Sequence, residues 1–356
     1  MRADAEPSKL TSNGWRQFFL LAAGTAAGVT AFIFLFVAIV DPFDTLPLSP
    51  PLDRVPIATN ARYSFPAIAR QQQFDSAIIG TSTSRLLRPD ELNAAFNARF
   101  INLAMNAATG YEQSRILEVF LRAHPTPKHV IFGLDDIWCL TRRLARYTPR
   151  PFPEWMYEPD RWTGYTRLLN LYTVEQAGIQ FATLTGFKAP VYGRDGYTRF
   201  VPDDRLYDPA RVAVHLREVA AAMPRGDATV SPATLPYPAL DLLRDNLSSV
   251  PASTTKILFF APFNHVERAD SGALRGEWDE CKRRVAAMAA ATPNTTVVDF
   301  MIPSQITDND DNYWDALHYR VAIADRLVRD LAAATAGHRA LNGDYVVLSP
   351  ASQAVR

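Results

Sequence analysis

Apolar residues are unevenly distributed along the chain, and one long stretch near the N-terminus carries no charge. From Phe18 to Val40 there are 23 consecutive residues without an ionisable side chain. A helix rises about 1.5 Å per residue, so this stretch can cross the roughly 30 Å hydrocarbon layer of a bilayer. The pattern therefore predicts a transmembrane helix over residues 18–40.

The charges on either side of this stretch predict its orientation. Basic residues precede it (Arg2, Lys9, Arg16) and acidic residues follow it (Asp41, Asp44, Asp53). Because Lys and Arg stay on the cytoplasmic side, residues 1–17 are expected to be a cytoplasmic tail and the rest to lie outside the cytoplasm. A cleaved signal peptide or a buried soluble helix remains an alternative. The length and the missing small-x-small cleavage site favour an uncleaved anchor.

Beyond the anchor, short apolar runs alternate with amphipathic patterns. Five runs are expected to be strands: 75–80, 100–104, 128–134, 256–262 and 295–300. Four patterns between or after them are expected to be helices: 89–96, 111–124, 277–291 and 322–336. Alternating strands and helices, with strands apolar on both faces, are typical of a parallel sheet covered on both sides.

The predicted fold is therefore an α/β, flavodoxin-like three-layer sandwich with a five-stranded parallel sheet. The expected segments are a linker at 41–69, the α/β domain at 70–336 and a C-terminal tail at 337–356. A gap at about 137–255 separates the third and fourth strands and is expected to be a mostly helical insertion, with helices near 165–182, 209–223 and 239–248.

Aromatic residues are concentrated at the start of this insertion. Trp155, Tyr157, Trp162 and Tyr165 either form a lid that stacks on sugars or pack the insertion onto the sheet. Packing is the commoner role of such residues, so we favour it.

Composition narrows the function classes. The chain has 37 basic and 37 acidic residues, and this balance argues against a nucleic-acid partner bound through bulk charge. Its two cysteines cannot build a disulfide framework, so Cys139 and Cys281 are expected to be two buried thiols rather than a bridge.

Candidate catalytic residues lie at strand ends, where ligands of open α/β sheets bind. Gly80-Thr81-Ser82 follows the first strand, and Asp315 and His318 lie three residues apart near the C-terminus. A serine needs a base to become a nucleophile, and a carboxylate can orient that base. Ser84 is an alternative exposed hydroxyl, while Ser82 and His318 also fit purely structural roles.

This arrangement resembles the SGNH (GDSL-like) hydrolase and acyltransferase superfamily. The resemblance covers about residues 70–136 and 254–335, and Gly80-Thr81-Ser82 and Asp315-x-x-His318 correspond to its first and last blocks. It implies that Ser82 is the nucleophile, His318 the base and Asp315 the orienting acid. It also implies that the segment 101–112, with Asn106, Ala108 and Gly110 as candidates, supplies an oxyanion donor.

The third block of the family, Gly-x-Asn-Asp, corresponds to residues 133–138, and Asp135 replaces its amide donor. An ionised carboxylate cannot donate a hydrogen bond. Asp135 must therefore be protonated, or it must hold Arg85 or another donor in place. His265, after the fourth strand, is a candidate for substrate binding.

The likeness is strongest to membrane-anchored envelope proteins of bacteria. It implies an O-acyl esterase or acyltransferase of the inner membrane, with its main domain in the periplasm, acting on an envelope glycan or related ester without a cofactor. Asp135 and the insertion favour an alternative: an inactive relative that binds an envelope polymer or scaffolds a membrane acyltransferase. A membrane-tethered sensor or structural protein unrelated to the family is a third.

No metal site is expected. The acidic segment 308–312 resembles a calcium loop, but Tyr313 replaces the required Gly and Tyr319 the bidentate Glu.

Overall fold

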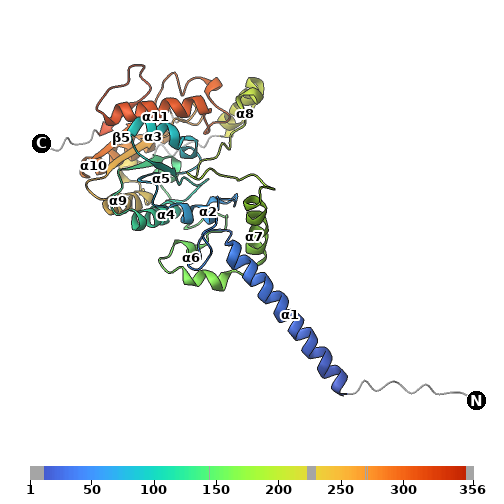
Figure 1. Cartoon of the computed structure of the whole chain (residues 1–356). Coiled ribbons are helices and arrows are strands. Elements are labelled where there is room, and N and C mark those ends of the chain that lie inside the picture. Colours follow the sequence, from blue (N-terminus) through green and yellow to red (C-terminus); the bar gives the residue numbers. More distant parts are fainter. Residues whose placement is uncertain (1–11, 144, 223–229, 269, 271, 350–356) are drawn as a thin grey trace, which may run out of the picture.

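The computed structural model describes residues 12–143, 145–222, 230–268, 270 and 272–349, and it shows an α/β domain with one long helix projecting from it (Figure 1). Within these residues a single sheet has the order β2-β1-β3-β4-β5-β6. Its strands are β1 (Ser76–Ile79), β2 (Phe100–Asn102), β3 (His129–Leu134), β4 (Thr255–Phe260), β5 (Thr295–Asp299) and β6 (Val346–Ser349). The first five strands pair in parallel.

Helices cover both faces of the sheet. In Figure 1, α3 (Pro89–Phe96) and α11 (Val321–Thr335) lie on one side, and α4 (Gly110–Ala123) and α9 (Ala239–Ser249) lie on the other. Helix α10 (Gly272–Ala290) packs beside β5 and β6. Each central strand is buried almost throughout, which explains its continuous apolar run.

The prediction of five strands is wrong by one. β6 pairs antiparallel with β5 at the edge of the sheet, within the segment 337–356 that was expected to be a tail. Its burial decreases toward its start, where Val346 is exposed, so its apolar pattern is that of a half-buried edge strand. Residues 350–356 of the expected tail lie outside the described residues.

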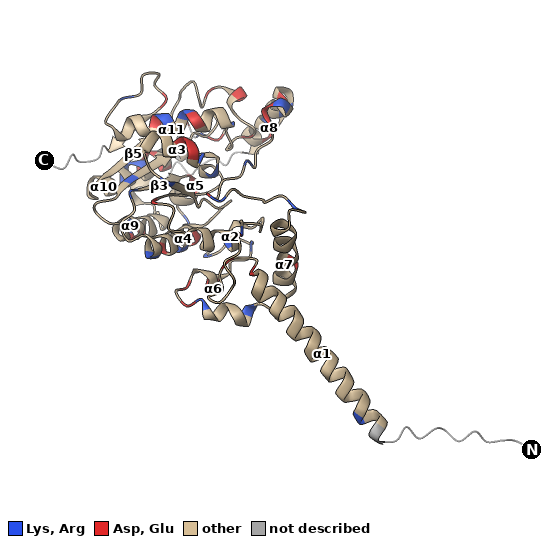
Figure 2. Cartoon of the chain, viewed as in Figure 1, with Lys and Arg blue, Asp and Glu red and all other residues tan. Residues whose placement is uncertain are grey.

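The projecting helix α1 (Ser12–Val40) contains the predicted span. Residues Gly14–Val40 are long and apolar enough to cross a membrane, and only 11% of their most apolar window is buried. Figure 2 shows α1 almost free of charged residues, in contrast to the domain. Residues 1–11 of the expected cytoplasmic tail lie outside the described residues.

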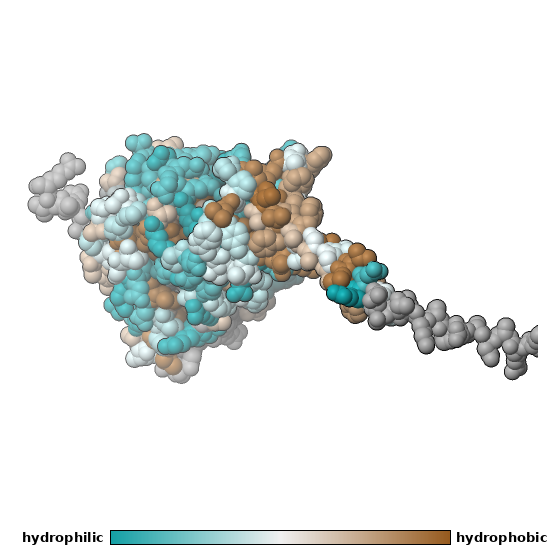
Figure 3. All heavy atoms as spheres, turned by 60° about the horizontal axis from the view of Figure 1, so that its bottom comes forward, coloured by the Kyte–Doolittle hydropathy of each residue, from teal (hydrophilic) through white to brown (hydrophobic). Residues whose placement is uncertain are grey.

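The C-terminal end of α1 packs against the domain. It packs along α7 (Leu171–Leu184), and Val37, Val40, Leu168 and Ala177 are buried between them. Figure 3 shows apolar surface gathered at this junction. Exposed large apolar side chains on α7 and its flanks are Leu169, Leu171, Phe181 and Phe187.

Residues 41–69, expected to be a linker, pack against the domain. They contain α2 (Ala61–Ile68), and Phe43, Ala58 and Phe65 belong to the main core. Asn60 caps α2 by accepting a hydrogen bond from the backbone N–H of Arg62. The segment between α1 and β1 is therefore part of the folded domain.

The insertion is helical, as predicted. Its elements are α5 (Asp136–Cys139), α6 (Glu154–Tyr157), α7, α8 (Pro209–Ala222) and α9, with short 3₁₀ helices η2 (Trp162–Arg167), η3 (Asp204–Leu206) and η4 (Pro232–Thr234). Of its early aromatics, Tyr157 is fully buried and donates to the carbonyl of Arg62, and Trp155 packs on the main core. Tyr165 packs near the end of α1. Only Trp162 is largely exposed, which agrees with the packing role.

The expectation of two separate thiols is wrong. Cys139, in α5, and Cys281, in α10, form a disulfide with a Cα–Cα distance of 5.5 Å across 142 residues of sequence. Two cysteines far apart in sequence give no signal of proximity, because only the packing of α5 against α10 brings them together.

Candidate active site

The structure brings Ser82, His318 and Asp315 together at the carboxyl edge of the sheet. The Oγ atom of Ser82 lies 2.8 Å from Nε2 of His318, and Nδ1 of His318 lies 2.7 Å from Oδ2 of Asp315. The three side chains form a continuous chain of hydrogen bonds from a strand-end hydroxyl through an imidazole to a carboxylate. This is the arrangement in which a histidine can remove the serine proton.

Asp315 is fixed and charged by its surroundings. Its Oδ1 atom accepts hydrogen bonds from the backbone N–H groups of Leu317 and His318, both at 2.8 Å. Burial alone raises the pKa of Asp315, but the His318 ring and these N–H groups outweigh it and hold the pKa below its usual value. An ionised Asp315 fixes the ring orientation and stabilises a protonated His318.

The turn that carries Ser82 is held from two sides. Tyr319, fully buried, donates its hydroxyl to the carbonyl of Thr83. Asn102, at the end of β2, donates its amide to the carbonyls of Ser84 and Leu87 at 3.2 and 2.9 Å. The backbone that follows Ser82 is therefore held in place by side chains from other elements.

Ser84 is not the exposed hydroxyl that the sequence left open. Its side chain is 0% exposed, and its Oγ atom has no hydrogen-bond partner among the described residues. It lies over Gly80 and Gly133, where an added Cβ atom would come within 2.3 and 1.7 Å of Oγ. Glycine is required at both positions because Ser84 fills the space that side chains would need.

Asp135 neither holds Arg85 nor faces solvent. Its Oδ2 atom accepts a hydrogen bond from the Thr81 hydroxyl, and its Oδ1 atom accepts one from the backbone N–H of Ile137 at 3.2 Å, so it caps α5. Burial, followed by the nearby Asp136 charge, raises the pKa of Asp135 to about 8. The carboxyl is therefore mostly protonated at neutral pH, with Thr81 as its partner.

The loop after β2 contributes backbone donors near Ser82. It is tied to β1 by the hydrogen bond from Met105 N–H to the carbonyl of Gly80, at 3.0 Å. The N–H of Ala108 donates to the carbonyl of Met105, and Gly110 begins α4 beneath the Trp138 ring. Among the described residues, the N–H groups of Ser82 and Ala107 have no acceptor. Ala107 has a left-handed backbone with φ of 51°.

Arg85 and Asn106 lie together beside this loop. Nη1 of Arg85 donates to Oδ1 of Asn106 at 2.5 Å. Two aromatic rings of the insertion flank the guanidinium, with ring centroids at 5.4 Å for Tyr192 and 5.0 Å for Phe200. Phe200 also lies edge-on to the His318 ring, at 5.5 Å between centroids. The insertion therefore forms part of the site.

A close backbone approach places these two aromatic residues. The carbonyl of Asp195 accepts a hydrogen bond from Asn102 N–H at 2.7 Å, so the insertion runs along β2. At Gly196 φ is 78°, and an added Cβ atom would come within 2.2 Å of the Asn102 carbonyl oxygen. Only glycine permits this contact.

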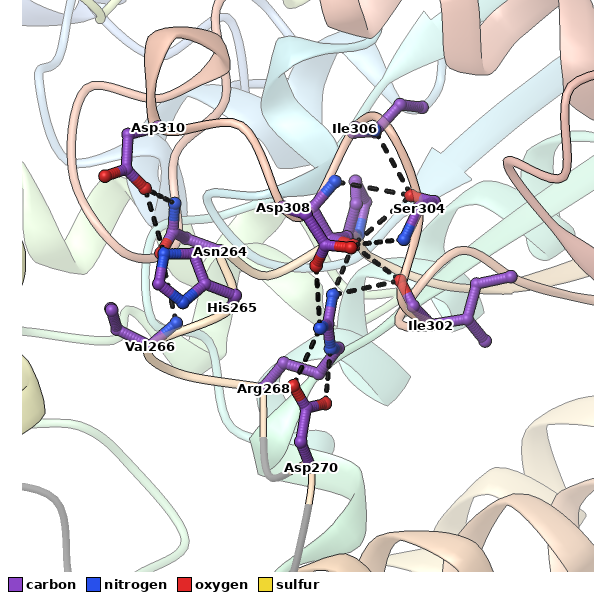
Figure 4. A network of polar contacts seen from close by, with 12 residues as sticks. Asn264, His265, Val266, Arg268, Asp270, Ile302, Ser304, Ile306, Asp308 and Asp310 are labelled. Atoms are coloured by element: carbon purple, nitrogen blue, oxygen red, sulfur yellow. Dashed lines mark hydrogen bonds and ion pairs between the residues drawn. The ribbon is translucent and has the colours of Figure 1, made fainter.

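His265 lies in a polar network that joins the loop after β4 to the loop after β5 (Figure 4). Its Nε2 atom lies 3.1 Å from Oδ1 of Asp310, which also accepts a hydrogen bond from the amide of Asn264. The backbone N–H of Asn264 donates to the carbonyl of Ala316 at 2.9 Å. Among the described residues, no contact joins His265 to Ser82, Asp315 or His318.

The acidic segment at 308–312 is tied into the same network. Arg268, 7% exposed, binds Asp270 and Asp308 as ion pairs and donates to the carbonyl of Ile302. Figure 4 shows the guanidinium between the two carboxylates. The loops after β4 and β5 are thereby locked together, which fixes the segment that leads to His318.

Acidic groups accumulate on the side of the site formed by α5 and the loop after β4. Burial, and then the charges of Asp136 and Asp315, raise the pKa of Glu267. Burial also raises the pKa of Asp136. We call Asp135, Asp136, Glu267 and Asp315 the acidic flank.

Several supporting residues were not found from the sequence. Asn102 had a usable signal, since it is a polar residue at the end of an apolar strand. Tyr192, Phe200 and Asn264 had none, because nothing in their local pattern indicates that they approach the site. Neither a protein-family model nor a curated protein sequence matches this chain.

Proposed function

We propose that this chain is a membrane-anchored, extracytoplasmic O-acyl esterase or acyltransferase of the SGNH type, acting on an envelope glycan or a related ester. The single observation that carries the proposal is the 2.8 Å contact between Ser82 Oγ and His318 Nε2, continued by the 2.7 Å contact to Asp315. The strand order 2-1-3-4-5 of the parallel strands is also the flavodoxin-like order.

The proposed reaction has two halves. Ser82 Oγ attacks the ester carbonyl carbon while His318 takes the hydroxyl proton, and the bond to the alcohol then breaks as His318 returns that proton to the leaving oxygen. In the second half, His318 removes a proton from water or from an acceptor hydroxyl, whose oxygen attacks the acyl-serine carbonyl carbon. The acyl–Oγ bond then breaks, and His318 returns the proton to Ser82 Oγ. Hydrolysis and transfer differ only in this second nucleophile.

The oxyanion of each tetrahedral intermediate needs fixed donors. The unpaired N–H groups of Ser82 and Ala107 support this role. Asp135 is assigned a positioning role instead, because its carboxyl oxygens are bound to Thr81 and to the start of α5.

The test of the chemistry uses the full chain in detergent or nanodiscs with a chromogenic acetyl ester. We expect Ser82→Ala to lose at least about 10³-fold in kcat, the scale on which triad members act. Ser84→Ala is the matched control, since it removes a buried hydroxyl two residues away that has no partner. Equal turnover by Ser82→Ala and wild type would reject the proposal.

Replacement of the family amide by Asp135 favours the alternative function, an inactive relative that binds an envelope polymer or scaffolds a membrane acyltransferase. A fluorophosphonate probe separates the two. Labelling of the wild type that disappears in Ser82→Ala supports the enzyme, and absence of labelling in folded protein supports the alternative.

Two observations support the proposed location outside the cytoplasm. The Lys/Arg bias around α1 keeps the N-terminus inside. The Cys139–Cys281 disulfide is typical of proteins outside the reducing cytosol. Protease treatment of spheroplasts should degrade the domain, whereas protection of the domain would contradict the orientation.

A further inference from the structure

A cavity of about 320 Å³ lies next to the segment that carries Ser82, since Arg85 is one of its lining residues. It is lined by Thr59, Asn60, Ala61, Arg62, Arg85, Asn106, Arg150 and Pro151. Three of these residues are arginines and none is acidic. The lining is therefore strongly cationic.

The three arginines differ in how their charge is balanced. Arg62 is neutralised, because its guanidinium forms a buried ion pair with Glu112 at 2.5 Å. In the described part of the chain, neither Arg85 nor Arg150 has a carboxylate partner. Arg150 is exposed and donates only to the carbonyl of Asn106, at 2.8 Å. The cavity thus contains two cations without counter-ions.

Arg85 differs from Arg150 because it is buried, with only 5% of its surface exposed. A guanidinium has five N–H donors, and the hydrogen-bond partners of Arg85 among the described residues, the Asn106 side chain and the Tyr192 hydroxyl, are both uncharged. Burial, and also the neighbouring Arg150 charge, lower the pKa of Arg85. A buried cation is costly unless an anion balances it.

The cavity is adjacent to the reacting groups. Arg85 follows Ser82 by three residues, on the 3₁₀ helix η1 (Ser84–Leu86). Phe200 contacts both the Arg85 guanidinium and the His318 ring. Asn106, which binds Arg85, immediately precedes the unpaired N–H of Ala107.

We propose that this cavity is an anion subsite, so that the ester substrate carries a carboxylate or phosphate group close to its acyl group. Arg85 binds this carboxylate or phosphate through two parallel N–H groups of its planar guanidinium. Arg150 binds it from the exposed rim of the cavity. The substrate is thereby oriented with its ester toward Ser82.

This inference rests on the proposed esterase or acyltransferase function, so its test separates binding from turnover. Full-length Ser82→Ala protein in nanodiscs is titrated calorimetrically with trigalacturonate, with a phosphorylated sugar (glucose 6-phosphate) and with neutral galactotriose. We expect saturable binding of at least one anion and a dissociation constant at least about tenfold weaker for the neutral sugar. The carboxylate and phosphate probes show which oxyanion the subsite prefers.

Variants of the cavity complete the test. In the Ser82→Ala background, Arg85→Gln is expected to weaken anion binding about tenfold or more, and Arg150→Gln a few-fold. Arg217→Gln, which removes an exposed arginine of α8 outside the cavity, is the control and keeps the affinity. If Arg85→Gln fails to fold, the exposed Arg150→Gln variant provides the same comparison.

Equal affinity for neutral and anionic sugars would overturn the subsite. Unchanged anion binding in both arginine variants would overturn it as well. Neither result affects the proposed triad, which is tested by Ser82 labelling. In the active protein, the ratio of kcat/KM for 3-acetoxybenzoate to that for its neutral methyl ester should fall about tenfold in Arg85→Gln.

Discussion

Two groups of charged residues near Ser82 differ in how their charges are balanced. On the acidic flank, each carboxyl group is either paired, as Asp315 is with His318, or held with a raised pKa, as Asp135 and Glu267 are. In the second group, which we call the arginine flank (Arg62, Arg85 and Arg150), two cations have no carboxylate partner in the described chain. The acidic flank is complete without a ligand, and the arginine flank is not.

From this difference we assign the acidic flank to the proposed reaction and the arginine flank to the binding of the substrate. Hydrogen bonds that are already formed belong to groups that must keep one geometry during a reaction. A cation without a counter-ion is a group that gains most when a ligand arrives. The predictions that follow perturb one flank and ask whether the other responds.

The largest effect is expected from the acidic flank, in Asp315→Asn. An amide at this position can leave His318 in the wrong tautomer, so kcat should fall by about 10³–10⁴-fold while anion binding is unchanged. Ester turnover and calorimetry measure the two properties separately. Asp311→Asn, an exposed change in the nearby η5 (Asp310–Asn312), serves as control. A drop below tenfold would show that Asp315 does not orient the base.

Removal of the disulfide should destabilise the domain. A bridge across 142 residues restricts the unfolded chain by roughly 4–5 kcal/mol, so the Cys139→Ala, Cys281→Ala variant should lose about that much free energy of unfolding. Chemical denaturation measures it. Reductant should destabilise the wild type to the same level and leave the variant unchanged. Because α5 begins next to Asp135, turnover should decrease more than anion binding.

Asp135→Asn should change how stability depends on pH. The folded-state pKa of about 8 lies above the unfolded value, so the contribution of Asp135 is full at low pH and is lost as the pH rises through 8. From pH 6 to pH 9 the wild type should lose about 3 kcal/mol relative to Asp135→Asn, most of it below pH 8. Thermal unfolding of both proteins across this range tests it. A constant difference between them would contradict the raised pKa.

The smallest effect is expected from salt on the arginine flank. Raising ionic strength from about 0.05 to about 0.5 M shortens the screening length to a few Å, so KM for an anionic ester should rise about three- to fivefold. KM for the neutral methyl ester should stay constant, because its binding involves no net charge. An equal response of both esters would mean that the arginines do not attract the substrate.

The sheet and its helices were predictable because local patterns determine them. Strand β3 was expected at 128–134 and lies at His129–Leu134, and α3 occupies the predicted residues 89–96. β6 was missed because it is short and half-buried, with an apolar pattern too brief to separate from a tail. The disulfide was missed for another reason, since it depends on two helices packing after a long insertion.

The candidate site likewise contains residues that the sequence predicted and residues that it did not. Ser82, Asp315 and His318 were chosen from strand ends and from spacing within one turn, and the structure brings them into contact. The role of Phe200 was not predictable, because it depends on a loop that reaches β2 through Gly196. The protonated state of Asp135 was one of two possibilities, and its burial against Thr81 favours it.

The contact between Ser82 and His318 joins positions 236 residues apart, and this separation has a consequence for the timing of activity. Ser82 is synthesised early, and His318, its proposed base, is synthesised much later. A partly synthesised or truncated chain that stops before residue 318 contains Ser82 without the histidine that we propose as its base. We therefore expect such fragments to be inert toward esters, so that activity begins only once the whole domain has been made and folded.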